Sequence, residues 1–300
     1  MEKIYSVIDV GTNNVLLLIA GKNKERIRII HRNSFTSALG KDMKDGFLTK
    51  EALDRTKVIL EEIIELSKKY TDKIIIIGTS CSREAKNISI LSGWLWNNFR
   101  IKYNIISGEN EAYFNGLANI KEFPDFNDIT LFDVGGGSTE FTFLKENKII
   151  SHLSTSIGVR RLHNEFPEDF QCRITRVTEI LNEMNIKNVS KQILIGIGGT
   201  VTNLSAVKKN LKEYDSNIIH KSILKKDEIK EIYADFRKMS EKQIADLIPF
   251  EPTRAEIILT GAMIIKEIID HFKADKIFVS DRGFQFGVLA QSEKELEKML

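Results

Sequence analysis

The stretch LFDVGGGSTEFTFL, residues 131–144, interrupts two apolar runs with an aspartate, three consecutive glycines and Ser-Thr-Glu. An ordinary hairpin turn needs only one or two special residues. Three glycines remove the side chains from a turn, so that a ligand can approach the backbone closely. Exposed backbone N–H groups attract anions, and a neighbouring carboxylate can hold a metal ion or a water. The stretch therefore indicates either a phosphate- and metal-binding loop or a mobile Gly-rich hairpin with a chance acid.

The same strand–Asp-Val-Gly–strand pattern occurs a second time near the N-terminus. VIDVGTNN, residues 7–14, places Asp9 at the end of an apolar strand, 124 positions before Asp133. A third glycine turn, GIGGT, covers residues 196–200. A repeat on this scale exceeds the period of a solenoid. It predicts two related halves, each presenting a phosphate-binding hairpin to a shared cleft.

Length and composition agree with two globular domains. The chain has 300 residues, of which 42% are hydrophobic and 29% charged, and a net charge of +2, which does not indicate a nucleic-acid partner. Strand patterns alternate with helix patterns, as expected for mixed sheets with helical cover. The polar break around Pro124 suggests a first domain of residues 1–122 plus 286–300 and a second domain of residues 123–285.

Several familiar classes of protein are excluded by missing motifs. The sequence contains no Walker-A loop, no Rossmann fingerprint after a strand and no His-Glu-x-x-His motif. Cys81 and Cys172 are isolated, which argues against a zinc site and agrees with a reducing compartment. No run is long and apolar enough to span a membrane, and no signal peptide is visible. We therefore expect a cytoplasmic protein without a membrane partner.

Carboxylates and glycine turns remain as the candidate chemistry. Asp9 and Asp133 end strands, Glu140 lies on the return strand, and Glu111 opens a helix after the segment IISG. Phosphoryl chemistry needs an oriented water, a cation that neutralises phosphate oxygens, and backbone N–H groups that hold them. The sequence can supply all three. Glu111 taken alone is better explained as a helix N-terminal acid that interacts with the helix dipole.

Seven motifs in one order resemble a known family, and they span about residues 4–290. They read VIDVGTNN, GTSCSREAKN, IISGENEA, LFDVGGGSTEF, SIGVRRL, GIGGTVTNL and RAEIILTGAMII. This order is similar to that of the exopolyphosphatase/guanosine pentaphosphate phosphohydrolase family, within the actin-like ATPase superfamily. The resemblance implies a short form without the C-terminal helical domain of longer members. It also implies two ribonuclease-H-like α/β domains, with mixed sheets, flanking a central cleft.

The resemblance further implies release of a terminal phosphate from polyphosphate or guanosine pentaphosphate, with Mg²⁺ as cofactor. Glu111 matches the general base, and Asp133 and Glu140 match metal-binding acids, which Asp9 joins by its equivalent position. The phosphate-binding residues that we expect are Gly11, Thr12, Asn13, Arg83, Gly135, Gly136, Ser138, Gly199, Thr200 and Arg254.

Three positions depart from the family pattern. Leu16, Ala38 and Gln285 stand where a basic residue is common, so that cationic partners of an anionic substrate are lost. A non-catalytic phosphate or nucleotide sensor therefore stays open as an alternative, as does an ATP-dependent kinase of the same superfamily. A homodimer is the oligomeric state that we consider.

Overall fold

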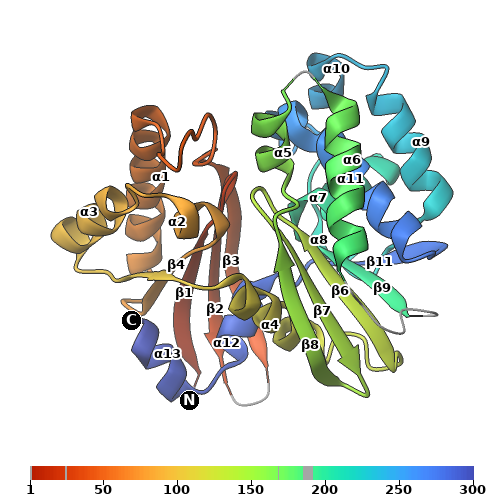
Figure 1. Ribbon diagram of the computed structural model, residues 1–300. Helices are drawn as coiled ribbons and strands as arrows, with labels where there is room; N and C mark the ends of the chain where they lie inside the picture. Colours follow the sequence, from red (N-terminus) through yellow and green to blue (C-terminus); the bar gives the residue numbers. More distant parts are fainter. Residues whose placement is uncertain (1, 24–25, 168, 185–191) are drawn as a thin grey trace. The chain divides into compact units, whose positions relative to one another are not determined.

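The computed structural model describes residues 2–23, 26–167, 169–184 and 192–300. The chain forms two compact units (Figure 1). Unit 1 comprises Met1–Ala118 and Phe284–Leu300, and unit 2 comprises Asn119–Gly283.

Unit 1 contains a mixed sheet in the order β3-β2-β1-β4-β5 among the described residues. Strands β1, β2 and β3 are antiparallel neighbours, whereas β4 is parallel to β1 and β5 is parallel to β4. The strands are β1 (Lys3–Val10), β2 (Asn14–Lys22), β3 (Ile27–Thr36), β4 (Ile74–Gly78) and β5 (Tyr103–Ile105). The helices are α1 (Lys50–Lys68), α2 (Ser80–Glu84), α3 (Ser89–Phe99), α4 (Gly108–Asn119), α12 (Phe284–Ala290) and α13 (Glu293–Met299).

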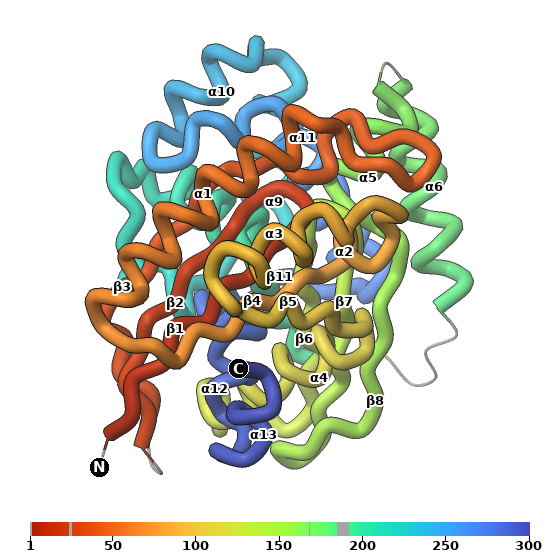
Figure 2. Tube along the Cα trace, turned by 90° about the vertical axis from the view of Figure 1, so that its left-hand side faces the viewer, coloured from red at the N-terminus to blue at the C-terminus, as the bar shows by residue number. Residues whose placement is uncertain are grey.

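Apolar side chains cover both faces of the unit 1 sheet. Because side chains alternate along a strand, Ile8 and Val10 of β1 join a cluster with α1 and α3, while Tyr5 and Val7 join a second cluster with α4, α12 and α13. The C-terminal helices thus return to the N-terminal strands, as the blue and red segments show (Figure 2).

Unit 2 contains a mixed sheet in the order β10-β11-β9-β6-β7-β8 in the described part of the chain. The strands are β6 (Asp128–Val134), β7 (Thr139–Lys145), β8 (Lys148–Thr155), β9 (Ile193–Ile197), β10 (Ile223–Lys225) and β11 (Lys276–Ser280). The helices are α5 (Val159–Glu165), α6 (Phe170–Glu183), α7 (Gly198–Lys208), α8 (Ser216–Ile219), α9 (Lys226–Phe236), α10 (Glu241–Leu247), the 3₁₀ turn η1 (Pro252–Arg254) and α11 (Ala255–His271).

Helix α11 is the central helix of unit 2. It is apolar on almost every side and buries residues along its whole length, as expected for a helix inside a core rather than on a surface. It packs with α5, α6, α7 and α9 against one face of the sheet, where Phe132 and Val134 of β6 point. Ile129 and Leu131 point to the other face and pack with Phe123.

The two sheets repeat one topology. The order β3-β2-β1-β4-β5 in unit 1 recurs as β8-β7-β6-β9-β11 in unit 2, with the same strand directions and with β10 added at the edge. The prediction of two mixed-sheet α/β domains is confirmed.

The chain passes from unit 1 to unit 2 at Asn119, whose side chain bonds two residues of unit 2. Asn119 accepts a hydrogen bond from the Ser280 hydroxyl at 2.5 Å and donates to the Arg282 carbonyl at 2.8 Å. At the return crossing, Phe284 packs in a cluster of unit 1. The compact units therefore divide slightly earlier than the sequence boundaries placed after residues 122 and 285.

Candidate active site

The Asp-Val-Gly segment of unit 1 forms the hairpin between β1 and β2. The Gly11 N–H donates to the Asn14 carbonyl at 2.9 Å, which closes the turn. Asp9 lies near the end of β1, is 8% exposed, and pairs in register with Leu16 of β2. The hairpin therefore carries one acid opposite an apolar residue.

The carbonyls of this turn are held by the loop that follows β3. The Gly40 N–H donates to Thr12 O at 2.8 Å, and the Ala38 N–H donates to Asn13 O at 2.7 Å. In a trans peptide the N–H points opposite to the preceding carbonyl, so the Asn13 and Asn14 amides point away from this loop. The Thr12 hydroxyl is buried and finds no hydrogen-bond partner among the described residues, so a ligand oxygen could satisfy it.

The hairpin of unit 2, between β6 and β7, has the same backbone geometry. The Gly135 N–H donates to the Ser138 carbonyl at 2.9 Å, as in unit 1. Here, however, Asp133 of β6 pairs in register with a second acid, Glu140 of β7.

The glycine carbonyls of this turn bond to the start of α5. The donors are the Val159 amide to Gly135 at 3.1 Å, the Arg160 amide to Gly136 at 2.8 Å and the Arg161 Nε to Gly137 at 2.7 Å. A Cβ at Gly158 would lie 2.3 Å from the Gly137 carbonyl carbon, so only glycine permits this close approach. Because the carbonyls face α5, the next three N–H groups point away from it, as in an anion-binding nest.

Asp133 and Glu140 are the residues best placed to hold a cation. Directly opposite residues share a face of the sheet, and two like charges there repel unless a cation or proton intervenes. Glu140 is 2% exposed, and its Oε1 accepts a hydrogen bond from the Ser154 hydroxyl at 2.8 Å. A Cβ built on Gly198 would lie 2.2 Å from Asp133 Oδ1, so this carboxylate lies against the Gly198 backbone.

The donor set fits Mg²⁺ better than a structural metal. Among the described residues, no group of three or more His, Cys, Asp or Glu side chains is placed to hold a metal ion. Mg²⁺ usually takes one or two carboxylates and completes its shell with waters and substrate phosphates, whereas structural zinc needs four protein ligands. The Asp133–Glu140 pair could contribute one or two carboxylate ligands to a divalent cation.

The third glycine turn begins α7 beside the same hairpin. The Thr200 hydroxyl donates to the Val134 carbonyl at 3.0 Å, which joins the two segments. The Arg254 guanidinium lies so close to Gly199 that a Cβ there would be 2.5 Å from its Nη2. Arg254 is 8% exposed and pairs with Glu251 at 2.9 Å, while Glu251 accepts from the Asn203 amide at 2.7 Å.

Glu111 is the buried acid of unit 1 outside the hairpin. It lies in the first turn of α4, where it is 8% exposed. Arg83 of α2 donates through Nη1 both to Glu111 Oε2 at 2.9 Å and to the Ile106 carbonyl at 3.0 Å. This contact fixes the orientation of the Glu111 carboxyl group, whose oxygens can accept a hydrogen bond from water.

The three positions that lack the basic residue common in the family lie in different structural surroundings. Gln285 is buried, and its amide donates to the Val7 and Leu16 carbonyls at 2.8 and 3.0 Å, so this position links α12 to the sheet. Ala38 is buried with a left-handed φ of 44°. Leu16 is half-buried opposite Asp9.

Sequence reasoning missed several residues that support these groups. Gly158 and Arg161 hold the unit 2 turn, Ser154 bonds Glu140, and Glu251 and Asn203 hold Arg254. The motif SIGVRRL contained the signal for the first two, because a glycine before a helix start permits close backbone packing. Ser154 and Asn203 bond residues that are 14 and 48 positions away, so no local pattern reveals them. Glu251 lies only three positions before Arg254, a spacing that is a local signal for an ion pair on a helical turn.

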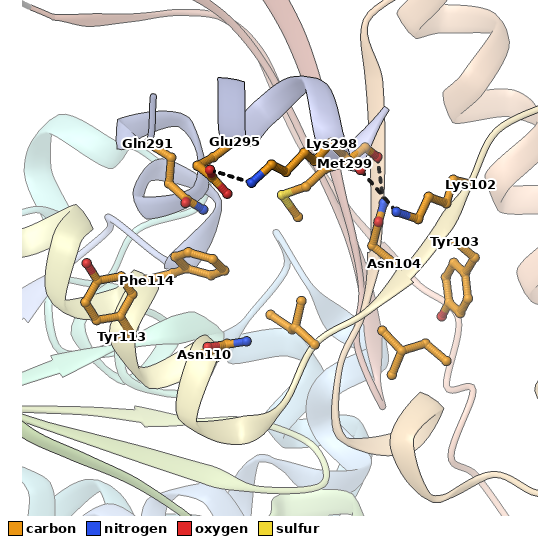
Figure 3. Close-up of a pocket in the computed structure, with 12 residues that line it drawn as sticks. Lys102, Tyr103, Asn104, Asn110, Tyr113, Phe114, Gln291, Glu295, Lys298 and Met299 are labelled. Carbon is orange, nitrogen blue, oxygen red and sulfur yellow. Dashed lines mark hydrogen bonds and ion pairs between the residues drawn. The ribbon is translucent and has the colours of Figure 1, made fainter. Parts of the chain in front are cut away.

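A separate pocket lies in unit 1 between β5, α4 and α13 (Figure 3). Its volume is about 500 Å³, and its lining includes Tyr113, Phe114 and Met299. None of the site residues predicted from the sequence lines it. Pocket size alone therefore does not identify the chemistry of this chain.

Known proteins resemble this chain in sequence family and in fold. A model described as the Ppx/GppA phosphatase family matches residues 18–296. A solved structure of a PPX-GPPA enzyme from Aquifex aeolicus is 25% identical, covers 97% of this chain and 100% of its own, and has a TM-score of 0.80.

Two curated relatives show different domain contexts. A bifunctional 3-dehydroquinate synthase/phosphatase of Fusobacterium nucleatum is 34% identical over 95% of this chain, which spans only 46% of that protein. Exopolyphosphatase 2 of Mycobacterium tuberculosis is 27% identical over 94% of this chain and 96% of its own length. These matches confirm the predicted fold and the predicted family. In the described part of the chain, no helix combines the length and apolar character needed to cross a membrane.

Proposed function

We propose that this chain, which belongs to the Ppx/GppA phosphatase family, releases the terminal phosphate of inorganic polyphosphate with the help of Mg²⁺. Guanosine pentaphosphate is the alternative substrate. The observation that carries this proposal is the unit 2 hairpin, where a glycine turn with outward amides adjoins two carboxylates on neighbouring strands.

The unit 2 hairpin suits binding of a terminal phosphate. The N–H groups after Gly135 would hold the phosphate oxygens, and the Ser138 hydroxyl can add a donor. Asp133 and Glu140 would hold the divalent cation, and Asp9 of unit 1 is proposed as a further ligand. When bound, such a cation neutralises negative charge on phosphate oxygens and thereby stabilises the transition state.

Glu111 would orient the attacking water and accept its proton. The water oxygen attacks the terminal phosphorus, the bond from phosphorus to the bridging oxygen breaks, and the shortened chain leaves. Arg83 fixes the orientation of the Glu111 carboxylate through the 2.9 Å contact. We propose that Arg83 and Arg254 also contact phosphate oxygens, since Arg83 bonds Glu111 and the Arg254 guanidinium lies against Gly199.

The relatives favour polyphosphate over a nucleotide as the first substrate to test. The Mycobacterium protein, named an exopolyphosphatase, aligns over nearly its whole length with this chain.

No disulfide joins Cys81 and Cys172, of which the first is buried and the second exposed, and this agrees with a proposed cytoplasmic location. A homodimer is proposed as the functional assembly.

A turnover screen tests the proposal directly. Purified protein is incubated with polyphosphates of several lengths, guanosine pentaphosphate and ATP, with and without Mg²⁺, and released phosphate is measured. We expect Mg²⁺-dependent release from polyphosphate, and release by the Glu111→Gln variant that is slower by roughly 10²–10⁴-fold. Phosphate binding without release on any substrate would instead favour the sensor, and phosphate transfer from ATP to an added acceptor would favour the kinase.

A further inference from the structure

We propose that Ser154 of β8 is a positioning residue for cation binding in unit 2. Its hydroxyl group holds the Glu140 carboxylate in the orientation in which Glu140 and Asp133 bind one divalent cation together. The inference rests on the proposed function, because it assumes that this pair of acids binds Mg²⁺. It assigns a role to a serine that lies outside the seven sequence motifs.

The strand register places Ser154 beside the two acids. Asp133 of β6 is paired with Glu140 of β7, and Glu140 is paired with Ser154 of β8, the next strand of the sheet (Figure 1). Directly paired residues on neighbouring strands project from the same face of a sheet. The three polar side chains therefore form one row across three strands, which we call the Asp133–Ser154 row.

The row is bounded on both sides. On the inner side, Asp133 is paired with the apolar residue Ile197 of β9. On the outer side, β8 is the last strand of the sheet in the described part of the chain. Within the row, Ser154 is therefore the one uncharged polar side chain next to Glu140.

Ser154 donates a hydrogen bond directly to Glu140. The distance from Ser154 Oγ to Glu140 Oε1 is 2.8 Å. Glu140 is only 2% exposed, so water has little access to replace this donor. A hydrogen bond to an ionised carboxylate is stronger than one between two neutral groups. Removal of the Ser154 hydroxyl group would therefore take away a strong contact that holds one oxygen of Glu140 in place.

The hydroxyl group acts on the cation through Glu140. A serine brings no charge to the site, but a carboxylate that is held by one oxygen presents its oxygens in a defined direction. Mg²⁺ demands nearly ideal octahedral geometry, so the direction of each ligand matters. Loss of a hydrogen-bond partner of a metal ligand typically weakens metal binding by about 10–100-fold.

The backbone that carries Ser154 is fixed by other contacts. The Thr155 hydroxyl donates to the Thr139 carbonyl at 3.0 Å, and the Thr139 hydroxyl donates to the Ile157 carbonyl at 2.7 Å. Thr139 and Thr155 alternate with Glu140 and Ser154 along their strands, so they project from the opposite face. Ser154→Ala should therefore keep the pairing of β7 with β8 while it removes the contact with Glu140.

The alternative is that the Ser154 hydroxyl group only joins β8 to β7. Its removal would then lower the stability of the chain and leave cation affinity unchanged. A cation-binding measurement combined with a double-mutant cycle separates the two roles, because residues that act through each other have non-additive effects.

The experiment measures binding of Mn²⁺, which prefers the same oxygen ligands as Mg²⁺, from the electron paramagnetic resonance signal of the free ion. The full chain is titrated without substrate. The variants are Ser154→Ala, Ser154→Thr, Glu140→Gln and the double variant Ser154→Ala/Glu140→Gln. The matched control is Ser151→Ala, which makes the same change at an exposed position of β8. Urea unfolding of each variant measures its stability separately.

We expect Ser154→Ala to raise the Kd for Mn²⁺ by about 10–100-fold. Ser154→Thr keeps the hydroxyl group and should bind Mn²⁺ within about threefold of the wild type. Ser151→Ala should change the Kd less than about twofold, as is usual for an exposed position. In the Glu140→Gln background, Ser154→Ala should also change the Kd less than about twofold, because the carboxylate that it positions is already gone.

An unchanged Kd in Ser154→Ala, with a raised Kd in Glu140→Gln, would overturn the inference and leave the cation site standing. Equal effects of Ser154→Ala with and without Glu140→Gln would also overturn it, because Ser154 would then not act through Glu140. A wild type that binds no Mn²⁺ would overturn it as well. If the expected Mn²⁺ affinities are found but no substrate releases phosphate, the hydrolase proposal fails while the role of Ser154 stands.

Discussion

In unit 1 the turn between β1 and β2 reads Gly-Thr-Asn-Asn, and in unit 2 the turn between β6 and β7 reads Gly-Gly-Gly-Ser. Both turns are closed by the same hydrogen bond at 2.9 Å, between Gly11 and Asn14 and between Gly135 and Ser138. Both also have their carbonyls bonded by a neighbouring segment, which turns the following amides away from it. One backbone arrangement thus serves both halves of the chain.

The side chains on the two hairpins differ. Asp133 faces Glu140 across the strands of unit 2, whereas Asp9 faces Leu16 in unit 1. Unit 1 instead carries its second buried acid, Glu111, on a helix that pairs with an arginine. A repeated scaffold can therefore preserve backbone geometry while its two copies take different chemical tasks, because the hydrogen bonds that shape the turn do not involve the side chains that do the chemistry.

The largest effect should come from the acid of unit 1 outside the hairpin. Glu111→Gln keeps the size of the side chain and its contact with Arg83 but removes the proton acceptor, so turnover on polyphosphate should fall by roughly 10²–10⁴-fold. Affinity for tripolyphosphate should change little, because the lost interaction belongs to the transition state.

The matched control is Glu109→Gln, which makes the same change at an exposed position in the first turn of the same helix. Steady-state kinetics on both variants would show a near-normal rate for Glu109→Gln. An equal loss of turnover rate in both variants would show that Glu111 is not the proton acceptor.

Substitutions in the two hairpins should change the Mg²⁺ requirement for turnover to different extents. Asp133→Asn and Glu140→Gln each remove one charge from the facing pair of unit 2, so the Mg²⁺ concentration for half-maximal rate should rise about tenfold or more. Asp9→Asn should raise it less, since Asp9 faces Leu16. A Mg²⁺ titration of turnover gives all three values, and an equal shift for Asp9→Asn would show that the two hairpins contribute equally to cation binding.

Replacing one glycine in each unit by alanine tests how tightly the backbone beside the hairpin is packed. Gly198 has φ +83° and lies against Asp133, so Gly198→Ala should lower the free energy of unfolding by about 1–2 kcal/mol from the backbone alone. It should also displace Asp133 and raise the Mg²⁺ requirement. Gly78, the last residue of β4, occupies the equivalent register position, and an added Cβ there would meet the Tyr103 hydroxyl at 2.5 Å without any unusual φ.

Urea unfolding of both variants measures this difference. Gly78→Ala should destabilise through the Tyr103–Ser82 hydrogen bond and leave the Mg²⁺ requirement unchanged. Gly93→Ala in α3 is the control, because nothing lies near its Cβ and it should stabilise by about 0.5–1 kcal/mol. An unchanged Mg²⁺ requirement in Gly198→Ala would contradict the proposed role of Asp133 in cation binding.

The smallest effect concerns pH. In unit 2 the hydrogen bond from His220 lowers the pKa of Glu122 to about 2, against 4.5 for an ordinary glutamate. The folded pKa lies below the unfolded one, so the stabilisation is complete above about pH 4.5 and is lost as the pH falls toward 2. In unit 1 the hydrogen bond from Lys3 lowers the pKa of the fully exposed Glu293, where solvent screens the pair.

Unfolding of wild type, Glu122→Gln and Glu293→Gln at pH 6 and pH 3 tests this contrast. The difference between wild type and Glu122→Gln should shrink at the lower pH, and Glu293→Gln should differ little from wild type at either. A pH-independent difference for Glu122→Gln would contradict the assigned hydrogen bond.

Much of the fold could be predicted from the sequence because its signals are local. An apolar run that ends in Asp-Val-Gly specifies a strand and a turn without reference to the rest of the chain, and two such runs indicated two related halves. The carboxylates of the candidate site were predictable for the same reason, since Asp133 and Glu140 are joined by one short hairpin whose length sets their register.

The amino-acid sequence by itself therefore determined the two hairpins, their acids and the alternation of strands and helices. Tertiary structure alone decided which groups contact and support these elements. Arg83 bonds Glu111, and the start of α5 bonds the glycine carbonyls of the unit 2 turn. Arg55 bonds the loop after β3, and Gln285 bonds the carbonyls of Val7 and Leu16. These contacts join residues that are 17 to 278 positions apart. No local pattern specifies them, because each depends on how whole strands and helices pack, and packing is settled by the apolar cores rather than by the polar residues that meet there.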